Sequence, residues 1–542
     1  MGWNFGDLFD AAAASVPAGR PALIHGDMTL GWAELDRRTN RAARALLARG
    51  LQPGDRVAVM ARNHPAFIEA VMAALKARMV YLTINYRYVA DEVAYILADS
   101  GAAALCVQPE FAPAVAGARA NLPSLLFALP SDGPSDGPGN GPELPGAEPW
   151  EALAGAGDGS PLGIERSGND TYLVYTGGTT GRPKGVVWRQ DAARATQLES
   201  PLARAVPRTL AEHAAAVAAN PAPSRVVPAC PLMHGAGINS SVAELANGGT
   251  VITLAARRFD AAELWSAASR HAATRVLIVG DVFARPMVAA LDDAPDRYDL
   301  SALRAISSAG LTWSADTKAG LLRHLPGVTL LDIFGASEAS SLGYAITDRT
   351  GAAPTGVFAP GPHTVLIGED GVVLPREPGR EGFVARSGAL PEGYLGAPAK
   401  TAEVYRTVGG VRYGIPGDLG RWEPDGSLRL IGRGSLCINS GGEKIHPEEV
   451  EHALRQLPEV EDALVVGVPD PRWGHAVAAL LLLRPGAAFD PAGARTALGG
   501  RLAGYKLPKA LLPVDSLPRH DSGKANYLHA VAMATERMGM AS

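Results

Sequence analysis

The chain has 542 residues, of which 47% are hydrophobic and 19% are charged, and its mean hydropathy is +0.04. This composition excludes a disordered protein, and the length favours one large domain with a smaller one beside it. The formal net charge of −5 excludes a global electrostatic attraction to nucleic acid or to an anionic membrane, so any phosphate must be bound locally.

The N-terminus and the cysteines lead us to expect a cytoplasmic protein. The chain begins with MGWNFGDLFDAAAA, which contains Asp7 and Asp10 and lacks the basic stretch of a signal peptide. The longest apolar run, 476–483, is far shorter than the ~18 residues that cross a bilayer. No cysteine spacing suits a zinc site, and an odd number of cysteines fits a reducing compartment: Cys106, Cys230 and Cys437.

Residues 29–125 alternate between helix-like and strand-like segments. Apolar residues recur at helical spacing over 32–47, a β-rich run follows at 56–60, and a second helical pattern covers 66–76. This alternation predicts layered α/β structure.

A Gly- and Pro-rich segment interrupts the pattern at 130–149, and its composition predicts a flexible surface insertion. It contains GPSDG at 133–137, which matches GxSxG. A nucleophile elbow needs a strand before this motif and a helix after it, so the match gives little support to an esterase.

A second mixed region spans about 160–430, and the pattern changes again near 432. A short charged helix is predicted at 447–456, followed by strand-like ALVVGV and AVAALLLL and a helix near 494–502. We therefore predict two domains, 1–431 and 432–542, the second of α+β type.

The segment 171–188, TYLVYTGGTTGRPKGVVW, carries the most chemical information. Two β-rich runs flank a loop with glycines, threonines and Lys184. Glycines let backbone N–H groups approach an anion, the hydroxyls donate further hydrogen bonds, and the lysine adds charge, so the loop is typical of a phosphate site. A Walker A loop would continue with Gly-Lys-Ser/Thr and a helix, whereas here a strand follows, which disfavours a P-loop NTPase.

YTGGTTGRPKG resembles the signature YTSGTTGxPKG of the adenylate-forming superfamily, which includes acyl-CoA synthetases, adenylation domains and luciferases. The resemblance continues in order through PLMHGAG (231–237), FGASEAS (334–340), YGIPGDLG (413–420), GRGSLCINSGGEKIHPEEVE (432–451) and PRHDSGK (518–524). It covers the chain outside the 130–149 insertion.

The resemblance implies an α/β fold, with a large N-terminal domain of two αβ subdomains plus a β-barrel and a small mobile α+β C-terminal domain. It also implies an ATP site. The β- and γ-phosphates would be held by Thr176, Gly178, Thr179, Thr180, Gly181 and Lys184, with Gly177 replacing the usual serine. Glu338 would bind Mg²⁺, because a carboxylate beside a triphosphate needs a cation between them, and Ser337 would contact the α-phosphate. Ribose would bind Asp418 and Arg433, and adenine would lie against Ser308, Ala309, Gly310, Asp332, Phe334 and Gly335.

For the acid, the resemblance points to His234 as a gate of the acyl pocket. Taken alone, such a histidine is more often structural. Further pocket residues would come from 236–240, 281–285 and 309–313. The predicted substrate-binding residues beside His234 are Gly235 and, within these ranges, Ala236, Gly237, Asn239, Asp281 and Trp313. These mainly small and apolar groups suggest a bulky hydrophobic acid, although Asp281 and Arg285 could instead pair with each other at the surface.

Lys524 would stabilise the negative charge that develops as the carboxylate attacks the α-phosphate, and Thr180 would assist as a catalytic residue of the phosphate loop. The C-terminal domain would turn about a hinge near Ser435, where the family usually has Asp or Lys. Gly441, Gly442 and Lys444 would then line the pantetheine tunnel, with Arg472 and Trp473 as further CoA contacts.

These features predict an ATP-dependent carboxylate:CoA ligase that uses ATP, Mg²⁺ and CoA and acts on a fatty, steroid-like or aryl acid. The resemblance leaves room for a homodimer and gives no role to nucleic acid. The alternative enzyme passes the acyl group from acyl-AMP to an amine. A non-catalytic nucleotide- or acyl-binding module is disfavoured because Lys524 and Glu338 are both present.

Overall fold

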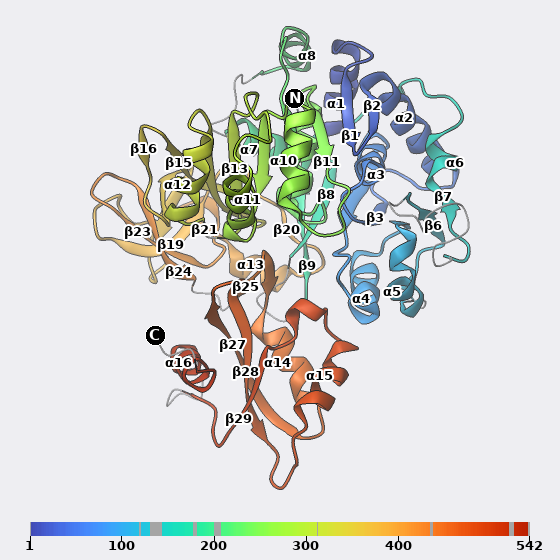
Figure 1. The fold of residues 1–542 in the computed structure, drawn as a ribbon. Helices are drawn as coiled ribbons and strands as arrows, with labels where there is room; N and C mark the ends of the chain where they lie inside the picture. The colour runs from blue at the N-terminus through green and yellow to red at the C-terminus, as the bar shows by residue number, and fades with distance from the viewer. Residues whose placement is uncertain are drawn as a thin grey trace.

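The computed structural model describes residues 2–118, 121–130, 144–176, 182–199, 207–311, 313–433, 437–519 and 525–539. Its strands form three sheets, and Figure 1 shows a large N-terminal part with a smaller C-terminal part, in orange and red, beneath it. The predicted organisation into a large α/β domain and a small α+β domain is confirmed.

The first subdomain is built on a largely parallel sheet. Its strands, in spatial order, are β20 (Gly393–Tyr394), β9 (Lys184–Arg189), β8 (Thr171–Thr176), β4 (Val80–Thr83), β3 (Arg56–Met60), β5 (Ala104–Val107), β6 (Leu125–Ala128) and β7 (Glu148–Pro149). The strand predicted at 56–60 is confirmed as β3. Residues 131–143 of the predicted insertion lie outside the described residues, but its last two residues form β7 and pair with β6. The insertion is therefore shorter than predicted.

The second subdomain contains the first part of a larger sheet. Its parallel strands lie between β2 on one side and β15 on the other. The order is β2 (Met28–Gly31), β1 (Pro21–His25), β11 (Thr250–Thr253), β10 (Arg225–Pro228), β12 (Arg275–Ile278), β13 (Ala305–Ala309), β14 (Thr329–Ala336) and β15 (Ala339–Asp348). The parallel strands end at the same edge, where α/β sheets commonly bind ligands.

Antiparallel strands extend this sheet where the barrel was expected. They are β16 (Gly351–Ala352), β17 (Val357–Pro360), β18 (Thr364–Ile367), β19 (Glu381–Arg386), β21 (Tyr405–Val408), β22 (Val411–Gly414), β23 (Asp418–Trp422) and β24 (Leu428–Arg433). The strands curl until β19 lies against β15, and Leu342, Val384 and Trp422 fill the interior. Among the described residues, β15 and β19 share no ladder pairing.

Helices cover both sheets and also fill the space between them. The N-terminal helices are α1 (Phe5–Ser15), α2 (Trp32–Ala48), α3 (Pro65–Lys76), α4 (Ala90–Ser100), α5 (Ala112–Gly117), α6 (Trp150–Ala154), α7 (Gln190–Leu198), α8 (Leu210–Ala218), α9 (Gly235–Ala246), α10 (Ala261–Arg270), α11 (Asp281–Asp293), α12 (Ala315–His324) and α13 (Pro398–Val404). One buried core joins α1, α3 and α9 to strands of both sheets, so the two subdomains share their interior. The predicted helices 32–47 and 66–76 correspond to α2 and α3.

The C-terminal domain consists of one sheet with helices on both of its faces. Its strands are β25 (Ile438–Ser440), β26 (Glu443–Ile445), β27 (Val460–Asp470), β28 (Gly474–Leu483) and β29 (Ala510–Val514), and its helices are α14 (Pro447–Arg455), α15 (Pro491–Gly499) and α16 (Tyr527–Arg537). Successive residues of β27 alternate between the core with α14 and α15 and the core with α16. The helix predicted at 494–502 begins earlier, because Asp490 caps α15 and Pro491 starts it.

Candidate functional site

The predicted phosphate loop connects two paired strands. β8 and β9 are antiparallel, and Thr176 lies opposite Lys184 at the open end of the pair. The two flanking strands are therefore confirmed. Gly178, Thr179, Thr180 and Gly181 lie outside the described residues, as does Gly177, and their phosphate contacts stay predictions.

Glu338 lies beside this loop although 162 residues separate it from Thr176. Its Oε1 accepts hydrogen bonds from Thr176 Oγ1 at 3.2 Å and from the Tyr394 hydroxyl at 2.8 Å. Burial, and then the Glu338 charge, raise the pKa of Tyr394 well above its ordinary value, which keeps this hydroxyl a donor. No hydrogen bond from a described residue reaches its Oε2. The residue lies in the turn between β14 and β15.

The residues predicted around adenine divide into two groups. Ala309, Gly310 and Gly335 line the cavity described below, as does Ser337. The others support the strand ends: Ser308 Oγ accepts the Gly280 N–H at 2.8 Å, Asp332 pairs with Lys318 at 3.2 Å, and Phe334 packs on Phe358. Burial raises the pKa of Asp332, although Lys318 opposes this shift, and its contact with adenine stays a prediction.

Asp418 and Arg433, predicted to bind ribose, lie opposite each other across the β23–β24 pair. The Asp418 side chain is buried. The register of β23 and β24 places Asp418 and Arg433 side by side. The sequence alone could not show this, because the two residues lie in separate motifs.

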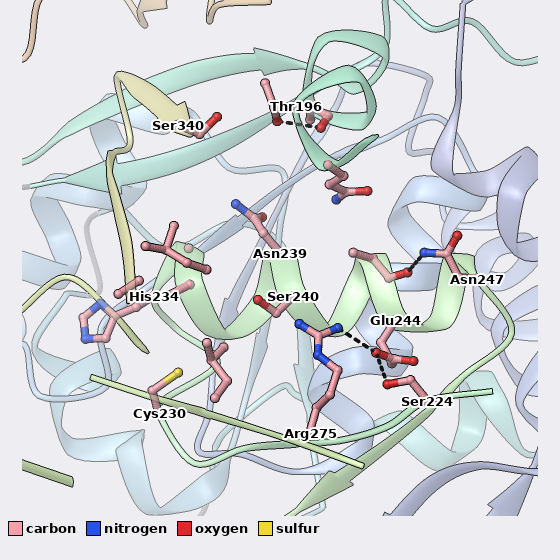
Figure 2. A pocket seen from close by; sticks show the side chains of 18 of the residues that line it. Thr196, Ser224, Cys230, His234, Asn239, Ser240, Glu244, Asn247, Arg275 and Ser340 are labelled. Atoms are coloured by element: carbon pink, nitrogen blue, oxygen red, sulfur yellow. Dashed lines mark hydrogen bonds and ion pairs between the residues drawn. The ribbon is translucent and has the colours of Figure 1, made fainter. Parts of the chain in front are cut away.

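A cavity of about 1230 Å³ runs between the two subdomains along α9. Figure 2 shows His234 at one end of this helix and Asn247 toward the other. Because side chains three or four residues apart share a helix face, Ala236, Asn239 and Ala243 all face the same space. Much of the remaining wall is small or apolar: Val174, Cys230, Met233, Leu277, Val279 and Ala309.

Four of the predicted acyl-pocket residues line this cavity, namely His234, Gly235, Ala236 and Asn239. Tyr81 donates to the Asn239 amide oxygen at 3.3 Å, which orients that side chain.

Three others do not line the described cavity, and their predicted role is corrected. Gly237 packs on the Pro231 carbonyl, where an added Cβ would lie 2.5 Å from the oxygen. Asp281 accepts hydrogen bonds from Ser314 and Thr317 at the start of α12 and pairs with Arg285 at 3.1 Å. Trp313 is fully buried in the core under α11 and α12. The alternative in which Asp281 pairs with Arg285 is the one observed.

The C-terminal domain contributes a hairpin to the mouth of the cavity. Gly441 and Gly442 have φ values of +59° and +91°, as the tight turn between β25 and β26 requires. Gly442 and Lys444 line the cavity, and their contacts with pantetheine stay predictions. A Cβ on Gly441 would lie 2.7 Å from the Trp473 ring, so this glycine permits close packing.

Glu443 connects the hairpin to the N-terminal domain, a role that the sequence did not reveal. Its carboxylate lies 3.3 Å from His234 Nε2 and 3.0 Å from Arg87 Nη1, and it accepts a hydrogen bond from Asn85 at 3.2 Å. Burial opposes the Glu443 charge, but His234 and then Arg87 and Lys506 bring its pKa below the ordinary value. Glu443 is therefore held as an anion at the domain interface.

Lys506 forms a second interdomain contact that sequence reasoning missed. It is 2% exposed, and its ammonium pairs with Glu92 of α4 at 2.5 Å and with Glu449 of α14 at 2.8 Å. Its Nζ also lies 4.7 Å from the centre of the Tyr88 ring. The sequence around such a lysine does not show that it is buried, because its acidic partners lie far away in the chain.

Lys524 lies outside the described residues. Arg519 and Ala525, which flank it, pair with each other, and Arg519 also pairs with Asp462 of the C-terminal domain at 2.5 Å. Ala525 packs in the core with α16, on the sheet face opposite α14. Arg472 stacks on Trp473 near the hairpin.

Two further observations concern only the residues that the structure describes. No helix there combines the length and hydrophobicity needed to cross a membrane. No group of three or more His, Cys, Asp or Glu side chains there is arranged to hold a metal ion.

Comparisons with known proteins find matches over most of the chain. A model of the AMP-binding enzyme family matches residues 9–395, and one of the AMP-binding enzyme C-terminal domain matches 449–524. The medium/long-chain-fatty-acid–CoA/3-oxocholest-4-en-26-oate–CoA ligase of Mycobacterium tuberculosis is 38% identical and covers 97% of this chain and 95% of its own. A 3-oxocholest-4-en-26-oate–CoA ligase of Rhodococcus rhodochrous is 36% identical, with the same coverage. Among solved structures, the amide bond synthetase McbA from Marinactinospora thermotolerans matches with a TM-score of 0.81 at 25% identity, covering 98% of this chain and 99% of its own.

Proposed function

Because this chain belongs to the AMP-binding enzyme family, we propose that it is an ATP-dependent ligase that joins a bulky, mostly hydrophobic carboxylic acid to CoA. In the first step, a carboxylate oxygen attacks the α-phosphorus of ATP, and acyl-AMP and pyrophosphate form. In the second, the CoA sulfur attacks the acyl carbon, the thiol proton leaves and AMP is released. Fatty and steroid acids are the proposed substrates, because the relatives named above act on them.

One observation carries the proposal: a single cavity connects the groups that the two steps need. Thr176 and Ser337 line it at the phosphate end, His234 and Ala236 line its acyl part, and Gly442 lines it from the C-terminal domain. An acyl-AMP formed at this junction would lie beside the hairpin that borders the thiol path.

The roles that we propose for the residues around ATP follow from the sequence motifs in which they lie. Thr176, Gly178, Thr179, Thr180, Gly181 and Lys184 bind the β- and γ-phosphates, and Ser337 binds the α-phosphate. Glu338 would ligate Mg²⁺ through its available oxygen, Oε2, and the ion would neutralise phosphate charge. Asp418 and Arg433 bind the ribose hydroxyls, and Ala309, Gly310 and Gly335 border adenine.

We also propose that the observed domain arrangement suits the second step. The hairpin with Gly441, Gly442 and Lys444 is at the cavity mouth, whereas the residues flanking Lys524 belong to the opposite face of the C-terminal sheet. Rotation near Ser435, which lies outside the described residues, would exchange the two faces. The proposed domains remain 1–431 and 432–542.

The second candidate is an amide synthetase, which the match to McbA favours. It shares the first step but would transfer the acyl group to an amine. Supplying the enzyme with acyl-AMP and either CoA or an amine, and identifying the product by mass spectrometry, separates the two. Thioester formation supports the proposal; amide formation with no thioester would contradict it.

A further inference from the structure

Two polar side chains line the acyl part of the cavity partway along its length, Tyr172 of β8 and Asn239 of α9. Asn239 follows His234 by five residues, which is about 7.5 Å along the axis of α9. Figure 2 shows it between His234 and the far end of this helix. The two side chains therefore border the path of the acid neither at its reacting end nor at its far end.

The position of Tyr172 follows from its neighbour Tyr81. The parallel strands β4 and β8 pair Leu82 with Leu173, so the two tyrosines before them leave the same face of the sheet. Their rings are parallel to within 1°, with centroids 5.2 Å apart. The Tyr81 hydroxyl donates to the Asn239 amide oxygen at 3.3 Å, and the Tyr172 ring lies directly beside it. The Tyr172 hydroxyl and the Asn239 amide thus belong to one polar region of the cavity wall.

Both groups have an open hydrogen-bonding position. Tyr172 is 3% exposed, and its hydroxyl has no partner among the described residues but keeps contact with the cavity. The same holds for the Asn239 amide nitrogen. Burial raises the pKa of Tyr172, so the hydroxyl stays protonated. By contrast, the hydroxyls of Thr83 and Thr196 on the same cavity donate to backbone carbonyls at 2.6 and 2.8 Å.

The two open groups make the filled cavity selective. Water satisfies such groups while a cavity is open, but an unsubstituted alkyl chain would displace that water and leave both groups unpaired. Burying polar groups without partners is costly, so a wholly apolar acid loses affinity at this depth. An acid that carries an oxygen at the same depth restores the hydrogen bonds.

We propose that Tyr172 and Asn239 recognise a hydroxyl group on an interior carbon of the acid. The hydroxyl oxygen accepts a hydrogen bond from Asn239 Nδ2, and the hydroxyl hydrogen is donated to the Tyr172 oxygen. The preferred acids are then hydroxylated partway along an otherwise apolar body, which is either a fatty chain or a steroid. The inference rests on the proposed function, because that function places the carboxylate at the His234 end of α9.

The test is equilibrium binding of matched acids to the whole enzyme, measured by calorimetry without ATP. One series is palmitic acid and its monohydroxy derivatives, in which the hydroxyl moves from the α-carbon to the ω-carbon. The other is cholanoic acid with and without a hydroxyl on ring C. We expect about tenfold tighter binding of an interior hydroxyl in at least one series, and the series that responds identifies the body of the acid. In the palmitic series the preference should vanish at both ends of the chain.

Tyr172→Phe tests the residue itself, because it keeps the ring that stacks on Tyr81 and removes only the hydroxyl. The preference for the interior hydroxyl should fall severalfold toward equal binding. Tyr298→Phe, which removes a tyrosine hydroxyl outside the cavity, should retain the preference. If Tyr172→Phe does not fold, the wild-type ratios still decide.

Equal binding within both series, binding of no acid, a preference only at the ends of the palmitic chain, or an unchanged preference in Tyr172→Phe would overturn the inference. Pyrophosphate release with the same acids is a separate measurement. Its absence with every acid would contradict the proposed function, whereas a binding preference would still stand.

Discussion

At the scale of single residues, the proposed role of Glu338 as a Mg²⁺ ligand is supported by the way its carboxylate is held. Thr176 and Tyr394 orient its Oε1, and no described residue donates to Oε2. The charge is therefore positioned before ATP binds, and its deletion should affect ATP chemistry more than folding.

Glu338→Ala should reduce Mg²⁺-dependent pyrophosphate release by about 100-fold or more, the scale of one preorganised electrostatic group, with little change in melting temperature. Tyr394→Phe, which removes one oriented hydroxyl and retains the carboxylate, is the matched control and should lose much less. Unchanged turnover and Mg²⁺ dependence in Glu338→Ala would place the ion elsewhere.

His213 gives a pH prediction. Its Nε2 lies 2.8 Å from the Ala246 carbonyl, and its Nδ1 faces Arg194, so the neutral ring donates from Nε2 and accepts at Nδ1. Burial, and then Arg194, lower its pKa from 6.5. The unfolded chain therefore binds a proton more readily, and stability should fall as the pH drops below 6.5 toward the folded-state pKa.

Urea unfolding at several pH values checks this prediction. The wild-type free energy of unfolding should decrease between about pH 7 and pH 5 more steeply than that of His213→Gln, which has no titrating ring. Parallel curves for the two proteins would contradict the assignment.

At the scale of elements, the β25–β26 hairpin depends on its glycines. Gly441→Leu would place a branched side chain at a φ of +59° and against the Trp473 ring. We expect it to slow thioester formation from acyl-AMP severely and to spare pyrophosphate release. Gly486→Leu, a positive-φ glycine with open space around its Cβ position, controls for backbone strain alone. Loss of both half-reactions in Gly441→Leu with the fold intact would exclude a role confined to the second step.

Local sequence patterns predicted most of the helices and strands, because the residues that form each pattern lie within a few positions of one another. Arg56–Met60 is a strand as expected, and β8 and β9 flank the phosphate loop. The family resemblance gave Thr176 and Glu338 roles at the same triphosphate, and their side chains lie 3.2 Å apart.

Side-chain direction was not predictable in the same way. Gly237 lies in the motif with His234, yet it faces the Pro231 carbonyl because it is on another side of α9. Trp313 and Asp281 lie near the strand ends, but core packing and the start of α12 engage them.

At the scale of the whole molecule, the Lys506 contact holds the two domains in the observed arrangement. Burial raises the pKa values of Glu92 and Glu449 above their ordinary range, although Lys506 opposes this shift. The ammonium between them stabilises charges that would otherwise be costly to bury.

Glu92→Gln should therefore weaken this arrangement. The rate at which this variant forms thioester from acyl-AMP should fall about tenfold. Its rate of acyl-AMP formation should change little, because the proposed rotation would break the contact in any case. Asp91→Asn, an exposed neighbour on α4, is the control. Equal loss in both half-reactions would indicate a purely structural role for the ion pair.

The central claim, that one cavity serves two steps through two domain arrangements, is tested most directly by measuring both half-reactions of Lys524→Ala. Acyl-AMP formation should fall by orders of magnitude, because the cation that stabilises attack on the α-phosphate is missing. Supplied with acyl-AMP and CoA, the same variant should form thioester within about tenfold of wild type, a barrier change below ~1.4 kcal/mol, because acyl-AMP already carries a good leaving group. Equal loss of both half-reactions in a folded variant would contradict the account.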